Sequence, residues 1–149
     1  MTVDPALARD VNGEPRGEGR RMSRRAAGAF EVRMTREPGG EEAAIGRFAL
    51  DKTYHGGLEG TSRGQMLSAG AVEKGSAGYV AIEIVRGTLD GRSGSFALQH
   101  GGTMTRGSAR LTIDVVPDSG TDELEGLTGA MTIRVESGRH EYELDYALP

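Results

Sequence analysis

One carboxylate in this sequence lies in an otherwise apolar segment. Glu83 is the only charged residue of YVAIEIV (residues 79–85). Side chains alternate between the two faces of a strand, so Glu83 would share a face with Ala81 and Val85. If that face lines the interior, burial raises the pKa of the carboxyl group and makes Glu83 a candidate general acid or base. If the flanking isoleucines fill the interior instead, Glu83 faces solvent or a subunit contact, and the sequence leaves both orientations open.

Two more polar residues share a face with apolar neighbours. His100 follows Phe96 and Leu98 at two-residue spacing, so it faces inward if those two belong to the core. There it either bonds to a backbone carbonyl or a hydroxyl, or takes part in acid–base chemistry. Lys52 lies two residues before Tyr54 on a face that is predicted to be buried. A lysine at such a position either reaches the rim or pairs with an acid.

No sequence motif indicates a metal or a cofactor. The three histidines, His55, His100 and His140, fall in different predicted strands, without metal-ligand spacing around them. The chain has no cysteine, which excludes disulfides, thiol nucleophiles and cysteine-ligated metals. The motifs of dinucleotide binding, phosphate binding, zinc proteolysis and α/β-hydrolase chemistry are absent as well. We therefore predict no metal and no cofactor.

The elements that must position these residues are predicted from apolar residues that alternate with period two from Ala27 onward. The eight strand-like segments centre on residues 30–34, 46–55, 58–69, 79–85, 96–100, 111–115, 131–135 and 142–148. No segment between them is long enough for a crossover helix, so neighbouring strands should pair antiparallel. We predict an all-β fold, an eight-stranded antiparallel meander closed into a small barrel, because closure removes both free edges. A two-sheet sandwich is the alternative.

Glycines mark the expected bends and turns of this meander. Gly60 and Gly64 lie inside the third strand and suggest bulges or bends. Residues 58–62, 89–93 and 124–128 share the pattern Leu-acid-Gly-x-Ser/Thr. We interpret this echo as repeated turn chemistry, in which the hydroxyls cap exposed amides. A cation site built from the three copies would lack the clustered oxygen ligands that calcium or magnesium needs.

Length and charge limit the class of protein. A chain of 149 residues fits one domain, and its net charge of −4 argues against a nucleic-acid partner. No apolar run reaches the ~18 residues of a membrane span, and no signal-peptide core appears, so we expect a cytoplasmic protein without membrane contact. Residues 1–26 hold six arginines and four acidic residues without apolar periodicity, which predicts a disordered tail before a barrel domain at 27–149. Met22 is a candidate start of translation.

Three long motifs resemble a known bacterial family. They are LDKTYHGGLEGTSRGQMLSAG (50–70), GSAGYVAIEIVRGTLDGRSGSFALQHGGTM (75–104) and VVPDSGTDELEGLTGAMTI (115–133). In this order they are similar to the uncharacterised domain of unknown function 3224, over residues 27–148. That family resembles the allene oxide cyclase barrel group, which includes the plant dirigent proteins. The resemblance implies a small eight-stranded antiparallel barrel, often oligomeric, that binds apolar small molecules inside it; it supplies no catalytic residues.

Two functions of different classes follow. In the first, the barrel binds an apolar small molecule and has isomerase- or cyclase-type activity, which needs only a dry cavity and one or two polar groups. The catalytic candidates are then Glu83 and His100, and the ligand-contacting candidates are Lys52, Tyr54, Phe96, Leu98 and Tyr142. In the second, the protein is a non-catalytic structural or oligomerisation module whose barrel is filled by its own side chains. The segment 79–85, apolar on both faces, should then be central or covered by a second subunit of a homo-oligomer.

Overall fold

The structure, a computed structural model, describes residues 22–149 and consists of eight long strands with two short 3₁₀ turns. The strands are β1 (Met22–Glu37), β2 (Gly46–Gly56), β3 (Leu58–Ala71), β4 (Ser76–Leu89), β5 (Arg92–Thr105), β6 (Ser108–Val115), β7 (Thr128–Glu136) and β8 (Arg139–Leu148). The 3₁₀ turns are η3 (Val72–Lys74) and η4 (Asp122–Leu124). The residue alternation thus produces all eight predicted strands.

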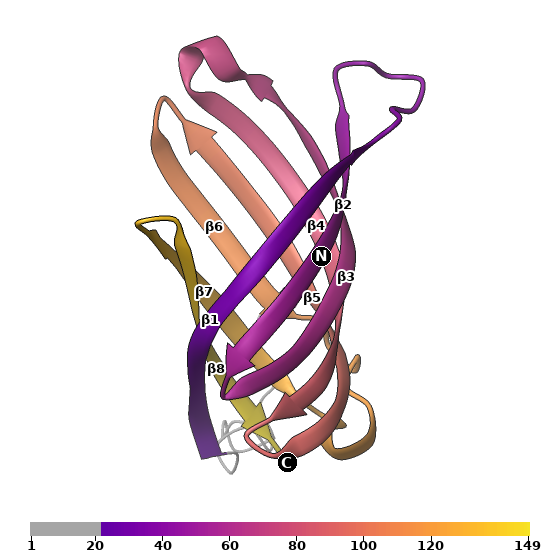
Figure 1. The fold of residues 1–149 in the computed structure, drawn as a ribbon, viewed down its shortest axis with the longest axis vertical. Coiled ribbons are helices and arrows are strands. Elements are labelled where there is room, and N and C mark those ends of the chain that lie inside the picture. The colour runs from indigo at the N-terminus through magenta and orange to yellow at the C-terminus, as the bar shows by residue number, and fades with distance from the viewer. Residues whose placement is uncertain (1–21) are drawn as a thin grey trace, which may run out of the picture.

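The strands close into a barrel in sequence order, each antiparallel to its neighbour, and β1 pairs with β8 (Figure 1). This confirms the predicted fold class and excludes the sandwich. Tight turns set the register: β4 and β5 meet at Asp90 and Gly91, whose φ angles of 47° and 87° match the twist of the two strands. The contact between β6 and β7 is the narrowest, with the single pair Asp114 and Ala130.

The two ends of the barrel differ. At the end where β4 turns into β5, the connection between β6 and β7 contributes the fully buried Leu124 and Leu127, which pack with core residues of the strands. At the opposite end, the hairpins splay apart (Figure 1). There, four large apolar residues on the inward-facing positions of their strands are between 43% and 59% exposed: Met34, Met104, Leu111 and Val135. We call these four residues the open-end set.

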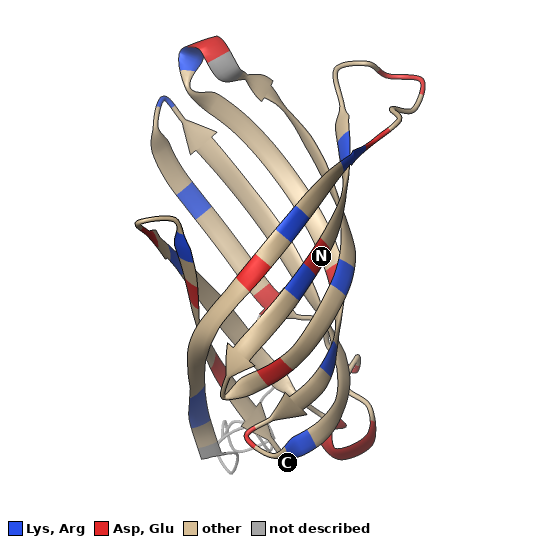
Figure 2. Ribbon diagram, in the orientation of Figure 1, with Lys and Arg blue, Asp and Glu red and all other residues tan. Residues whose placement is uncertain are grey.

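The outer surface of the barrel is mixed in charge. Figure 2 shows basic and acidic residues interspersed over the strands rather than gathered by sign. Several pair across strands, for example Arg25 with Asp145 at 2.7 Å and Arg134 with Glu141 at 2.8 Å. Such exposed pairs contribute little stability.

Two sequence predictions need correction. The barrel begins at Met22 rather than Ala27, because residues 22–30 pair with β8 and Ala26 is buried against it. The prediction of a tail was therefore wrong for residues 22–26, where Ala26 faces inward and Arg25 pairs with Asp145 of β8; residues 1–21 lie outside the described residues. Of the bulges or bends predicted at Gly60 and Gly64, the bulges are absent, since the pairing of β3 with both neighbours runs without interruption.

Candidate functional site

A buried carboxylate forms the centre of the most distinctive site. Glu83 is fully buried, and four side chains donate hydrogen bonds to its two oxygens. Lys52 Nζ and His100 Nε2 each lie 2.7 Å from Oε2, and Ser62 Oγ lies 2.9 Å from Oε1. The Tyr54 hydroxyl donates a short hydrogen bond to Oε1. We call these five residues the Glu83 cluster.

Four consecutive strands supply the Glu83 cluster. Lys52 and Tyr54 come from β2, and the other three members come from β3, β4 and β5. The residue opposite Glu83 on β3 is Gly64, where a Cβ atom would lie 2.3 Å from the Ile82 carbonyl oxygen and 2.8 Å from the Glu83 Cα atom. Glycine is therefore required for the close approach of β3 and β4, and its missing side chain leaves room for the β2 residues to reach the carboxylate.

The charge of Lys52 is buried with an opposite charge and against aromatic rings. The lysine is 7% exposed, and its ammonium group lies 4.9 Å from the ring centre of Phe30 and 5.9 Å from that of Tyr54. Both contacts stabilise a cation that has lost most of its water. Lys52 thus pairs with an acid rather than reaching the rim, one of the two alternatives that its position predicted.

The pKa of Glu83 differs in direction from the sequence prediction. Burial raises the pKa of this carboxyl group, but the hydrogen bond from His100 and the charge and hydrogen bond of Lys52 lower it more, so that it falls from 4.5 to about 2. The prediction of a raised pKa was wrong because burial alone was considered and the partners were not. Glu83 is therefore an ionised hydrogen-bond acceptor at neutral pH, not a ready proton acceptor or donor.

The two tyrosines near Glu83 remain protonated. Burial, followed by the negative charge of Glu83, raises the pKa of both Tyr54 and Tyr79. Tyr54 therefore acts as a hydrogen-bond donor to the carboxylate. Tyr79 is only partly buried, and its hydroxyl lies 3.5 Å from His100 Nδ1.

His100 connects the buried carboxylate to the open end of the barrel. A carboxylate only accepts hydrogen bonds, so His100 Nε2 carries a hydrogen, and Nδ1 is directed toward Tyr79. The next inward residue after His100 on β5 is Gly102, and the ring of Tyr79 on β4 lies over it. Gly102 is paired with Leu111 of β6, which belongs to the open-end set. His100 and Tyr79 thus lie between Glu83 and the exposed apolar residues.

The structure brings together four of the seven predicted site residues and places the other three in the core. Glu83, His100, Lys52 and Tyr54 converge, whereas Phe96, Leu98 and Tyr142 are buried core residues. Tyr142 has a structural partner instead: its hydroxyl accepts a hydrogen bond from the Leu58 amide at 2.9 Å, which ties β8 to the start of β3.

Two members of this region were missed in the sequence. Ser62 belongs to one of the Leu-acid-Gly-x-Ser/Thr segments that we interpreted as turns, but it lies inside β3 and donates to Glu83. Tyr79 shares the face of Glu83 at four residues' distance, and this spacing was the available signal.

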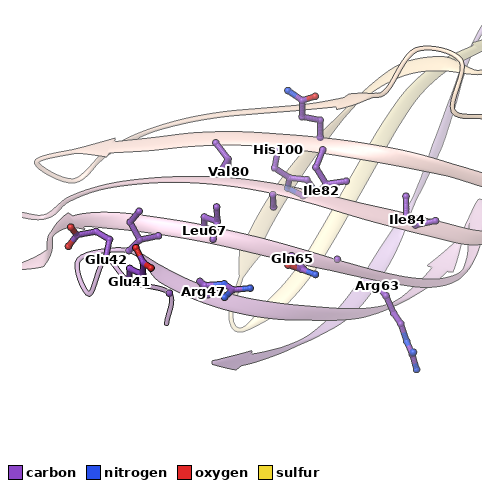
Figure 3. Close-up of a pocket in the computed structure, with 15 residues that line it drawn as sticks. Glu41, Glu42, Arg47, Arg63, Gln65, Leu67, Val80, Ile82, Ile84 and His100 are labelled. Carbon is purple, nitrogen blue, oxygen red and sulfur yellow. The ribbon is translucent and has the colours of Figure 1, made fainter. Parts of the chain in front are cut away.

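An apolar groove lies on the outer face of the barrel. It has a volume of about 1090 Å³ and runs over the outward residues of β3 and β4 beneath the connection between β1 and β2 (Figure 3).

Among the described residues, no group of three His, Cys, Asp or Glu side chains is placed to hold a metal ion. Within the same part of the chain, no helix has the length and apolar character that crossing a membrane requires.

The fold and the Glu83 cluster together define a small closed antiparallel β-barrel with a buried, fully partnered Lys–Glu–His centre. Residues 26–146 match the family described as "Protein of unknown function (DUF3224)", and the chain belongs to that family. The family predicted from the sequence motifs is thereby confirmed.

A solved structure of another family member is similar to this chain. It is the crystal structure at 1.84 Å resolution of a protein of unknown function from the DUF3224 family of Shewanella oneidensis MR-1. The two sequences are 50% identical, the TM-score is 0.80, and the similarity covers 86% of this chain and 99% of that one. None of the curated proteins matches the chain.

Proposed function

We propose that the open end of the barrel binds an apolar small molecule. The observation that carries this proposal is the open-end set, whose four large side chains occupy inward positions and are about half exposed. Apolar side chains on inward positions of a barrel normally contribute to its core. Their exposure at one end is typical of a surface that a ligand covers.

The polar groups nearest to this surface fix the chemistry that we assign to it. His100 and Tyr79 lie between the Glu83 cluster and the open-end set, so they would contact a polar group of the ligand. Proton transfer at the imidazole or the hydroxyl suits an isomerase- or cyclase-type reaction without a cofactor. Glu83 would then be a positioning residue, because it is enclosed and acts through His100.

The second candidate function is the structural module, which a different observation favours. Below the open end, the barrel is filled by its own fully buried side chains, including Tyr54, Phe96 and Leu98. Among the described residues, every buried side-chain nitrogen or oxygen has a hydrogen-bond partner. A filled interior with a satisfied polar centre also serves stability alone.

Binding of the apolar fluorophore anilinonaphthalene sulfonate distinguishes the two functions. We expect saturable binding by the native protein and at least about tenfold weaker binding by Leu111→Lys, since a charge placed on the apolar surface costs more than 1.4 kcal/mol. Thr112→Lys is the matched control, because Thr112 is adjacent to Leu111 on β6 and is exposed but faces outward; its binding should be unchanged. Native mass spectrometry of the same two variants, purified from the natural host, identifies any retained molecule. Equal fluorophore binding by Leu111→Lys and the native protein, with no retained molecule, would favour the structural module.

A further inference from the structure

We infer that the outer face of β3 and β4 pairs with the same face of a second copy of this chain. This inference does not depend on the proposed function, because it concerns the opposite side of the barrel wall. The eight exposed large apolar residues of the described chain divide into two sets. Four are the open-end set, and the other four are Ile45, Leu67, Val80 and Ile82, which we call the outer set.

The outer set forms one continuous surface. Leu67 on β3 is paired with Val80 on β4, and Ile82 lies one outward position further along β4. These residues and Ile45 line the groove of about 1090 Å³, and their exposed fractions lie between 41% and 57% (Figure 3). A strand buried on its inner face and apolar on its outer face is typical of a sheet that is covered on both sides.

The shape of the groove favours a protein surface over a small molecule. Small-molecule sites enclose 70–90% or more of the ligand within roughly 300–1,000 Å³. This groove has the outer face of a sheet as its floor and the connection between β1 and β2 along one side. Its apolar floor, wide and open, instead has the character of the apolar centre of an interface between identical subunits.

The distribution of charge identifies the partner as a second copy. Figure 3 places Glu41 and Glu42 at one end of the groove, with Arg47 beside them, and Arg63 toward the other end, with Leu67, Val80 and Ile82 between. In a two-fold symmetric contact centred near Ile82, the acidic end of one copy lies on the basic end of the other, at both ends of the interface. The Arg63 side chain is 87% exposed and contacts the Asp51 carboxylate at 3.5 Å, which leaves most of its guanidinium group open to a partner.

The centre of this contact is self-complementary as well. Ile82 is paired with Gln65 on β3 and with Gln99 on β5, and both glutamines are exposed. A primary amide both donates and accepts hydrogen bonds, so two glutamines related by a two-fold axis can pair with each other. The isoleucines would then meet at the axis, surrounded by amides and, further out, by the charged ends.

Sedimentation equilibrium of the full chain tests the inference. The native protein should sediment as a dimer at concentrations of about 10–100 μM, and Ile82→Lys should weaken dimerisation at least about 100-fold, since the substitution occurs twice at the axis. Leu111→Lys is the control: it changes an equally exposed apolar residue on the inner face and should leave the dimer intact. Circular dichroism verifies that both variants are folded.

A charge-swap experiment tests the pairing itself. Arg63→Glu in one protein and Glu41→Arg with Glu42→Arg in another should each weaken self-association at least about tenfold, because like charges then face each other. An equimolar mixture of the two should form a heterodimer, in which opposite charges meet at both ends.

A native protein that is monomeric at 100 μM, a dimer unaffected by Ile82→Lys, or a mixture without heterodimers would each overturn the inference. A monomer carrying a small apolar molecule in the groove would overturn it as well. The fluorophore assay compares the native protein with variants of β6 residues that lie outside the outer set, so a failure of dimerisation and a failure of binding at the open end are distinguishable.

Discussion

Replacement of Glu83 by glutamine tests whether the buried carboxylate is held ionised by its partners. The substitution preserves the shape of the side chain and removes its charge, while Lys52 stays buried beside it. Breaking a buried ion pair by removing one partner costs about 3–5 kcal/mol, because the other charge is left uncompensated. For an unpartnered carboxylate the same substitution would stabilise the protein. The structure therefore predicts a loss of stability at neutral pH, out of a total that is about 5–15 kcal/mol for typical domains.

The pH dependence of stability gives a second value for the contribution of the ionised Glu83 to the free energy of unfolding. The pKa of Glu83 is about 2 in the folded protein and 4.5 for an ordinary glutamate. At about 1.4 kcal/mol per pKa unit, this difference corresponds to about 3 kcal/mol of stability at neutral pH. Because the folded-state pKa is the lower one, this stability is present above about pH 5 and is lost as the pH falls through 4.5 toward 2. About 2 kcal/mol of it should be lost by pH 3.

Urea unfolding, followed by circular dichroism at pH 7, 5, 4 and 3, measures this loss. The free energy of unfolding of the native protein should fall by about 2 kcal/mol more than that of Glu83→Gln between pH 7 and pH 3. Glu143→Gln is the matched control, since its carboxylate is half exposed and 3.7 Å from Arg25; it should retain the native pH dependence. The reasoning fails if Glu83→Gln keeps the native slope, or if it raises stability at pH 7.

The remaining predictions concern packing and buried hydrogen bonds. Gly64→Ala should destabilise the protein by about 2–3 kcal/mol, because the added Cβ atom would lie 2.3 Å from a backbone oxygen. Gly40→Ala is the control: no atom lies within 4 Å of the added Cβ, so stability should change by less than about 0.5 kcal/mol. Urea unfolding measures both changes. Tyr142→Phe should cost about 1–3 kcal/mol, since it leaves the buried amide of Leu58 without its hydroxyl partner, and amide hydrogen exchange at Leu58 should accelerate. A Tyr142→Phe protein with native stability and native exchange at that amide would contradict this role.

The eight strands could be predicted because their alternation is strong and their connections are short. Period-two patterning identifies a strand whatever lies across from it, and the absence of crossover helices leaves antiparallel pairing as the simple solution. The start of β1 was missed because residues 22–26 carry arginines at a density typical of a solvated tail. In the barrel, these arginines lie on a strand whose Ala26 is buried, and Arg25 pairs with Asp145 of β8, which no local pattern reveals.

The orientation of Glu83 could not be predicted because β4 is apolar on both faces. Alternation divides β4 into one set with Ala81 and Val85 and another with Ile82 and Ile84, but hydrophobicity does not tell which set faces inward. In the structure, residues on the neighbouring strands determine which set faces inward. Gly64 leaves room beside the carboxylate, and Lys52, Ser62 and His100 donate hydrogen bonds to it. The pKa of Glu83 was predicted in the wrong direction because the prediction took account of burial alone, whereas the partners that lower the pKa come from other strands.

The position of the Glu83 cluster also bears on how the barrel reaches a single register. A buried ion pair is seldom more stabilising than apolar residues of the same size, so its contribution to stability alone does not explain a lysine, a glutamate and a histidine inside a barrel. The donors to Glu83 come from β2, β3 and β5, and a one-residue slip of any of these strands turns its donor to the outer face and removes a hydrogen bond from the buried carboxylate. Alternative registers are therefore penalised at three strand pairs simultaneously. The arrangement that holds His100 beneath the open end is thus the same one that fixes how four neighbouring strands align.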